Sequence, residues 1–202
     1  KEIALNIPAS IQSPSGLPQE GVLSVQVGEH LWPELGARLG YLLDYPHGCV
    51  EQTTSSTLPL LAARDILPRI GVSRFSDEEL KNKIRAGLLR LNSMKTPSGG
   101  LAYWPGGYEP NVYGTAYAMR AVVLAKKGNI AIPPGLLEGM ESYLSTHLLS
   151  TYVEPEVRAA IAQSLAELGS LKPAHTDALF DRLGELSVFG AASQALAFAA
   201  LP

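Results

Sequence analysis

The sequence has one cysteine, Cys49, among 202 residues, which excludes an intrachain disulfide framework and any metal site built from several cysteines. Basic residues are also few, with 16 Lys and Arg against 19 Asp and Glu, and the longest basic run is Lys126-Lys127. We therefore expect neither a nucleic-acid-binding face nor direct insertion of this segment into a membrane. No apolar run has the length of a signal-peptide core or a transmembrane helix.

Metal-ligand spacings, phosphate-binding loops and dinucleotide fingerprints are absent from the sequence as well, so no cofactor and no metal are expected. Hydrophobic residues make up 46% of the chain and charged residues 17%, a composition that supports a packed core and argues against disorder. The first residues alternate like a strand, and the last residues stop inside an apolar run without a helix-ending signal. We expect a domain cut from a longer protein.

The hydrophobic pattern changes its period once along the chain. Residues 1–28 alternate with period two between prolines, which predicts a β or loop segment from a neighbouring domain. After about residue 30 the period is helical, which predicts a mainly α domain over residues 29–202, truncated at its C-terminal end and made of antiparallel helical hairpins. The predicted helices are one that ends at Pro46, one over about 53–67 with a late start or a kink at Pro59, and others at about 76–94, 112–127, 135–149, 154–168, 174–186 and 190–201.

Cys49 is followed three residues later by Gln52, and these two side chains can be joined covalently. Displacement of ammonia from the Gln52 amide by the thiol gives an internal thioester in a ring of about 15 atoms, which requires a turn or the first turn of a helix. A thioester is an acyl donor because thiolate is a good leaving group. Pro46 and Gly48 favour a close approach of the backbone, and Glu51 either orients a nucleophile or interacts with the helix dipole.

The stretch Tyr45-Pro46-His47-Gly48-Cys49-Val50-Glu51-Gln52-Thr53-Thr54 closely resembles the thioester segment of the α2-macroglobulin and complement family, especially its bacterial members. The resemblance implies an α/α toroid, incomplete in a chain of this length. It also implies that cleavage of a bait region elsewhere exposes the Cys49–Gln52 thioester, which then acylates lysines of the attacking protease. Such a trap reacts once and is not an enzyme.

The same resemblance implies the partners and the location of the protein. The partners are target proteases, bound covalently through lysine, and the neighbouring domains of the full-length macroglobulin. The location is periplasmic or extracellular, with a lipid anchor at a distant N-terminus as one arrangement.

A glycine-rich aromatic loop, Gly99-Gly100-Leu101-Ala102-Tyr103-Trp104-Pro105-Gly106-Gly107, precedes the helix predicted at 112–127. Similar loops occur at the hairpin ends of α/α toroids. Two interpretations are open: its aromatic residues cap the helical core, or they shield the thioester from water. The candidate shielding residues are Tyr45, Tyr103, Trp104 and Tyr108.

Histidine decides which acceptor a thioester of this family prefers. Some complement proteins use a histidine a little over a hundred residues after the cysteine to favour hydroxyl acceptors, and here that zone reads Ala162-Gln163-Ser164-Leu165. We therefore expect direct attack by amines. The four histidines of the chain are His30, His47, His147 and His175.

Two other functions remain open from the sequence. A cysteine hydrolase would use Cys49 as its nucleophile and a histidine as base, but no base–orienter pair is evident. A structural or terpene-cyclase-like α/α toroid would need no thioester. Cyclases of this shape need an aspartate-rich motif, and the aspartates of this chain are isolated: Asp44, Asp65, Asp77, Asp177 and Asp181.

Overall fold

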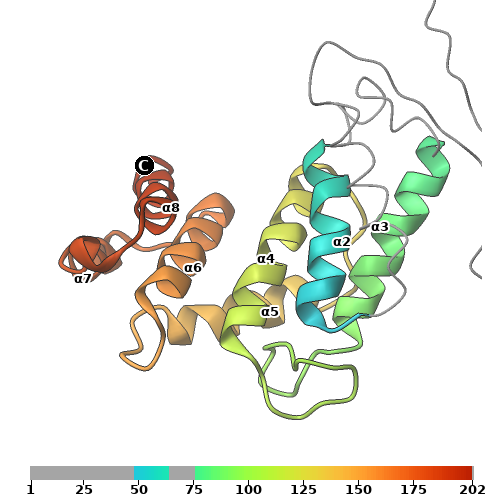
Figure 1. The fold of residues 1–202 in the computed structure, drawn as a ribbon, viewed down its shortest axis with the longest axis horizontal. Helices are drawn as coiled ribbons and strands as arrows, with labels where there is room; N and C mark the ends of the chain where they lie inside the picture. Colours follow the sequence, from blue (N-terminus) through green and yellow to red (C-terminus); the bar gives the residue numbers. More distant parts are fainter. Residues whose placement is uncertain (1–47, 64–75, 202) are drawn as a thin grey trace, which may run out of the picture.

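The computed structural model describes residues 48–63 and 76–201, and within these ranges the protein is mainly α-helical, as predicted (Figure 1). The β segment predicted at 1–28, the helix predicted before Pro46 and the last residues of the helix predicted at 53–67 lie outside the described residues. The helices are α2 (Val50–Ala63), α3 (Asp77–Asn92), α4 (Val112–Lys127), α5 (Leu136–His147), α6 (Pro155–Leu168), α7 (Thr176–Phe180) and α8 (Val188–Ala199), with 3₁₀ turns η1 (Pro173–His175) and η2 (Leu183–Glu185) on either side of α7.

Four helices, α2, α4, α6 and α8, form one row, and α3 and α5 pack against it. α2 and α4 run in the same direction and α3 runs in the opposite one (Figure 1). α2, α4, α6 and α8 contact one another in that order, whereas α3 packs on α2, and α5 packs on α4 and α6. This order brings the N-terminal ends of α2 and α4 together, so close that a Cβ on Gly114 would lie 2.5 Å from a methyl group of Val50.

Local capping determines where several helices begin and end. The Ser76 hydroxyl accepts from the Glu79 N–H at 3.2 Å, and the Glu79 carboxylate accepts from the Ser76 N–H at 2.7 Å, which is the predicted capping box of α3. Asn111 starts α4 by accepting from the Gly114 N–H at 2.6 Å. Gly169 ends α6 in the left-handed region, with φ of 78°. The predicted ranges of α3, α4, α5, α6 and α8 agree closely with the structure.

Two predicted helices differ from the structure. α2 begins at Val50, before the predicted start at residue 53, and Pro59 lies inside it rather than at its beginning. The single helix predicted over 174–186 is wrong, because α7 ends at Phe180 and a separate 3₁₀ turn follows. Gly184 lowers the helix propensity of that turn, and the Arg182–Glu185 ion pair closes it over one turn.

The core lies between the row of α2, α4, α6 and α8 and the helices α3 and α5. Leu80, Ile84, Leu88 and Leu91 form the predicted apolar face of α3, and all four are buried. Other fully buried side chains come from α4, α5 and α6: Met119, Met140, Leu144, Ile161 and Leu165. This core fixes the relative positions of the helix ends that carry the candidate site.

α2 and α3 approach each other most closely at Gly87. A Cβ at this position would lie 2.0 Å from Thr57 Oγ1, so any side chain here would push the two helices apart. The Thr57 hydroxyl is buried and donates to the Thr53 carbonyl at 2.7 Å, so it cannot turn away without losing that bond.

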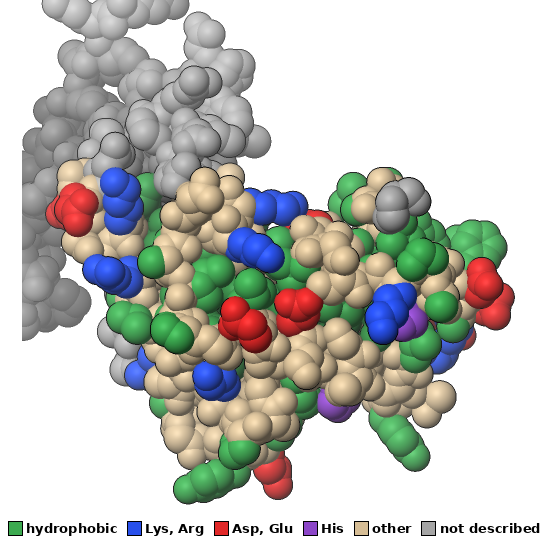
Figure 2. Space-filling view, turned by 180° about the vertical axis from the view of Figure 1, so that it is seen from behind, with side chains coloured by type: hydrophobic (Ala, Val, Ile, Leu, Met, Phe, Trp, Pro, Cys, Tyr) green, Lys and Arg blue, Asp and Glu red, His purple; other side chains and the backbone are tan. Residues whose placement is uncertain are grey.

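Charges on the surface are mixed in sign. On the face seen in Figure 2, basic and acidic side chains are interspersed and form no continuous basic area. None of the helices over 48–63 and 76–201 has both the length and the apolar character needed to cross a membrane. In the same part of the chain, no three side chains of His, Cys, Asp or Glu are grouped as metal ligands.

Candidate functional site

Cys49 is 3% exposed and stands directly before α2 as its N-cap residue. Its carbonyl accepts from the Thr53 N–H at 2.9 Å, which is the first hydrogen bond of the helix. Its Sγ accepts from the Gln52 N–H at 3.4 Å, and the Gln52 side-chain oxygen Oε1 accepts from the Cys49 N–H at 3.2 Å. The two residues form a capping box in which cysteine replaces the usual serine or threonine.

The capping box of α3 shows what this arrangement does to the side chains. There the Ser76 hydroxyl lies 2.8 Å from Glu79 Oε2, because both side chains fold back over the same first turn. At the start of α2 the same pair of hydrogen bonds folds a thiol and a carboxamide back over one helical turn. The spacing Cys-x-x-Gln is thus a helix-start signal in addition to a chemical one. The expected first helical turn at this pair is present, although the helix range predicted from residue 53 began three residues too late.

Tyr103 reaches this helix start from the loop between α3 and α4. Its carbonyl accepts from the Val50 N–H at 3.0 Å, and its hydroxyl donates to Glu51 Oε2 at 3.1 Å. Hydrogen bonding to Cys49 and then to Glu51 raises the pKa of Tyr103 to about 12. The Cys49 sulfur, the Glu51 carboxylate and the Tyr103 hydroxyl therefore form one cluster.

Hydrogen bonds just before Tyr103 tie its loop to the segment after α3 and to α4. The Ala102 N–H donates to the Met94 carbonyl at 2.8 Å, and the Leu101 N–H donates to the Thr115 hydroxyl at 2.8 Å. Gly99 allows the loop to pass α5, because its φ is +90° and a Cβ there would lie 2.4 Å from the carbonyl oxygen of Gly139. Tyr103 is therefore positioned by a fixed loop.

Arg90 fixes the peptide before Cys49 from the other side. Its Nε and Nη2 donate to the Gly48 carbonyl at 3.3 and 3.1 Å. Gly48 is itself buried, and a Cβ there would lie 2.6 Å from Thr53 Oγ1, which explains why glycine stands at this position. Sequence reasoning identified Gly48 but missed Arg90, because nothing in the local sequence of α3 marks this arginine.

Comparison with known proteins identifies the family. Residues 26–150 match the family model of the A-macroglobulin TED domain. The chain belongs to this family. The alpha-2-macroglobulins of Escherichia coli and Xylella fastidiosa are 33% and 29% identical to it over 90 and 110 residues. These matches cover 44% and 54% of the chain but only 5% and 7% of the two relatives, so the chain spans a small part of their length.

Solved structures show the same fold. Native E. coli alpha-2-macroglobulin, from domain MG7 to its C-terminus, matches 82% of this chain with a TM-score of 0.73 and 23% identity, over 28% of its own length. Salmonella alpha-2-macroglobulin reacted with methylamine matches 82% of this chain with a TM-score of 0.66 and 23% identity, over 12% of its own length. The predicted resemblance to bacterial macroglobulins and the predicted mainly α, toroid-type fold are confirmed.

The aromatic residues of the glycine-rich loop of this TED domain do not cap its core. The loop is buried from Gly99 to Ala102, whereas Tyr103 and Trp104 are 40% and 52% exposed. Trp104 packs edge-on against Tyr103, with ring centroids 5.9 Å apart, and so adjoins the cluster at Cys49. Tyr108 is 87% exposed and no contact links it to that cluster.

The remaining predicted residues lie away from the site or outside the described chain. Tyr45, Pro46, His30 and His47 fall outside the described residues. His147 ends α5, where its Nδ1 lies 2.8 Å from the Tyr143 carbonyl and its ring stacks near that tyrosine. His175 lies in η1, and neither of these two histidines contacts Cys49.

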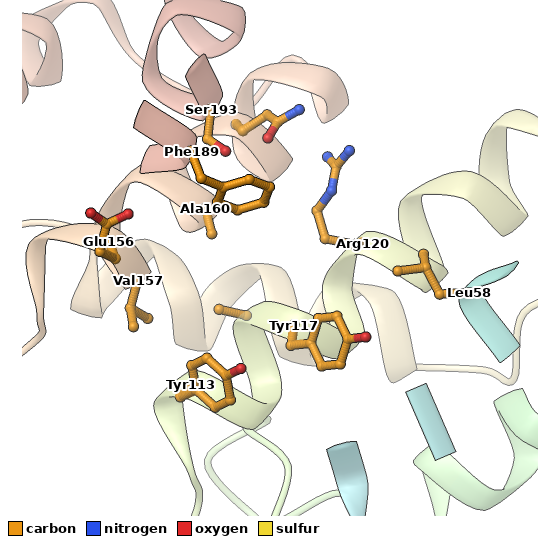
Figure 3. A pocket seen from close by; sticks show the side chains of 11 residues that line it. Leu58, Tyr113, Tyr117, Arg120, Glu156, Val157, Ala160, Phe189 and Ser193 are labelled. Atoms are coloured by element: carbon orange, nitrogen blue, oxygen red, sulfur yellow. The ribbon is translucent and has the colours of Figure 1, made fainter. Parts of the chain in front are cut away.

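A groove of about 510 Å³ lies on another part of the TED domain, between α2, α4, α6 and α8 (Figure 3). Tyr113 and Tyr117 line it with stacked rings 6.4 Å apart, opposite Phe189 of α8. Neither Cys49 nor Gln52 lines this groove. The candidate reactive pair therefore lies at a helix start and is not part of this groove.

Proposed function

We propose that this TED domain is the acyl donor of a macroglobulin-like protease inhibitor, in which a Cys49–Gln52 thioester captures an attacking protease through a lysine amine. The observation that supports the proposal is the capping box that folds the Cys49 and Gln52 side chains back over the same first turn of α2. Membership of the A-macroglobulin TED family supports it. So does the solved Salmonella relative, which was reacted with methylamine, a small amine of the kind that opens thioesters.

Formation of the thioester is an exchange at the Gln52 carbonyl carbon. The thiol sulfur forms a C–S bond, the C–N bond breaks, and the nitrogen leaves as ammonia with the thiol proton. During this exchange negative charge develops on the carbonyl oxygen, which accepts a hydrogen bond from the Cys49 N–H at 3.2 Å. That N–H and the positive end of the α2 dipole stabilise the charge.

Capture of a protease reverses the roles of sulfur and nitrogen. The lysine amine forms a C–N bond to the Gln52 carbonyl carbon, the C–S bond breaks, and Cys49 ends as a thiol with the proton that the amine loses. The product is an amide between Gln52 and the protease, so the trap is not regenerated. Bait cleavage, neighbouring domains and a periplasmic or extracellular location belong to the full-length protein and form part of the same proposal.

Intact mass tests the proposal directly. The full-length protein should be lighter than its sequence by one ammonia, and methylamine should add to Gln52 while releasing the Cys49 thiol. Cys49→Ser is the matched control, because a serine keeps the N-cap and the fold but forms no thioester. A wild-type protein with the full sequence mass and a thiol already free before methylamine would contradict the thioester.

The same experiment separates the cysteine hydrolase. A hydrolase keeps its thiol free before any amine is added, and it needs a histidine base within hydrogen-bond reach of the sulfur. Within the described residues, the histidines His147 and His175 do not contact Cys49. No observation at the site favours the hydrolase over the acyl donor.

A further inference from the structure

We propose that the Tyr103 hydroxyl stabilises the Cys49 sulfur as it departs, by moving its hydrogen bond from Glu51 to the sulfur when the thioester opens. This inference rests on the proposed acyl-donor function. It assigns to Tyr103 a chemical part in the reaction beyond covering the site. Tyr103 is suited to this part because its hydroxyl lies between an acceptor that is charged at rest and one that becomes charged during the reaction.

The geometry requires little movement for this transfer. The Tyr103 backbone is tied to the first residue of α2 by the 3.0 Å hydrogen bond from the Val50 N–H. Its ring is limited by the edge-on contact with Trp104. Its hydroxyl lies 3.1 Å from Glu51 Oε2, and the Cys49 side chain is close enough to contribute to the raised pKa of Tyr103. Tyr103 is thus held beside the start of α2, where its hydroxyl can exchange the Glu51 carboxylate for the neighbouring Cys49 sulfur.

The charges at the site determine which acceptor the hydroxyl prefers. In the thioester the sulfur is neutral and a weak acceptor, so the hydroxyl donates to the Glu51 carboxylate. As the amine attacks, the electron pair of the C–S bond moves to sulfur, which becomes the stronger acceptor. The hydroxyl then turns to the sulfur, and Glu51 Oε2 is freed to accept the proton that the attacking amine loses. That proton passes finally to the thiolate, so charge and atoms balance.

Tyr103 acts as a hydrogen-bond donor and keeps its proton throughout. Its raised pKa of about 12 lies above the pKa of a lysine amine, about 10.4, so the hydroxyl is intact wherever unprotonated lysine is available. A hydrogen bond to a charged acceptor contributes about 1.5–3 kcal/mol. Because the hydroxyl gives up its bond to the Glu51 carboxylate, only the difference between the two bonds speeds the reaction, which corresponds to up to about tenfold in rate.

The test is Tyr103→Phe in the full-length protein, with thiol release by methylamine as the readout. The ring and the backbone hydrogen bond remain, so only the hydroxyl is lost, and opening should be slower by up to about tenfold. Tyr152→Phe is the control, because Tyr152 is 97% exposed between α5 and α6 and its hydroxyl has no part in the site. The direction of the change is decisive, since loss of a mere shield would make opening faster.

Formation of the thioester gives a second readout. Formation from Cys49 and Gln52 is the reverse of opening by ammonia, so Tyr103→Phe should also slow the appearance of the ammonia-loss mass. An opening rate that is unchanged or faster in Tyr103→Phe would overturn the proposal. A wild-type protein that never loses ammonia would instead refute the acyl-donor function itself.

Discussion

Two capping boxes in this protein have the same geometry and different chemistry. In Ser76–Glu79 a hydroxyl meets a carboxylate, which is a poor electrophile, and the contact serves only to start α3. In Cys49–Gln52 a thiol meets a carboxamide, and sulfur is both a better nucleophile and a better leaving group than oxygen. The identity of two atoms thus distinguishes a helix cap from a candidate acyl donor.

Trp104 provides a prediction at the same scale. Its ring packs edge-on against Tyr103, which reaches the helix start at Cys49, and we expect the ring to limit the access of water there. Trp104→Ala should therefore raise the hydrolysis rate of the intact thioester several-fold. The rate is measured over time as a gain in protein mass of one water and as the loss of reactivity towards methylamine. Tyr152→Ala removes an exposed aromatic side chain elsewhere and serves as the control. Equal hydrolysis rates in the wild type and Trp104→Ala would show that this ring only packs.

The residues of the site differ in how far they can be predicted from sequence. The spacing of Gly48, Cys49 and Gln52 is local, and a short motif was enough to single them out. Arg90 contacts Gly48 across 42 residues, and Tyr103 contacts Glu51 across 52. These contacts depend on how α3 and the following loop pack against α2, which no local pattern encodes.

At the scale of helices, the close contact between Gly87 and Thr57 sets the distance between α2 and α3. Gly87→Ala improves helix propensity but places a methyl group against Thr57, so we expect a net loss of about 1–2 kcal/mol in the free energy of unfolding. Thermal or denaturant unfolding measures this change. The double variant Gly87→Ala, Thr57→Ala should recover part of the loss, because it removes the atoms that the new methyl group meets.

Gly184 is the matched control for this variant. It lies in η2 with no atom within 4 Å of its ideal Cβ, so Gly184→Ala should change the free energy of unfolding little. Equal free energies of unfolding of the wild type and Gly87→Ala would contradict this, because they would mean that α2 and α3 accommodate the methyl group without loss of stability.

Helix ranges were predictable where capping and periodicity agree, as in α3, with its capping box and its buried apolar face. They were not predictable over 174–186, where the apolar pattern continues but the backbone breaks into a short helix and two 3₁₀ turns. Periodicity reports which residues are apolar, and it does not report how tightly the backbone winds.

At the scale of the whole protein, the choice of acceptor is open to test. The zone expected to supply a complement-type histidine contains Ala162, Gln163, Ser164 and Leu165 of α6. An amine attacks a thioester without help, whereas a hydroxyl needs a general base, so methylamine adducts should predominate over glycerol adducts at matched concentrations. Because the lysine pKa is about 10.4, capture should speed up about tenfold for each pH unit between 7 and 9.

Adduct masses after bait cleavage measure this preference. Predominant glycerol esters at neutral pH would mean that a histidine reaches the site in the full-length protein. His147→Ala and His175→Ala, made separately, would then show which one is responsible.

The hydrogen bond from the Val50 N–H to the Tyr103 carbonyl joins the first residue of α2 to a loop that carries the half-exposed Trp104 ring. Pressure on this ring from outside would therefore reach the backbone next to the sulfur without contact with the sulfur itself. In the proposed acyl donor, this peptide contact would couple the surface of the domain to its reactive atom. A trap that reacts only once would thus be open to discharge from its surface.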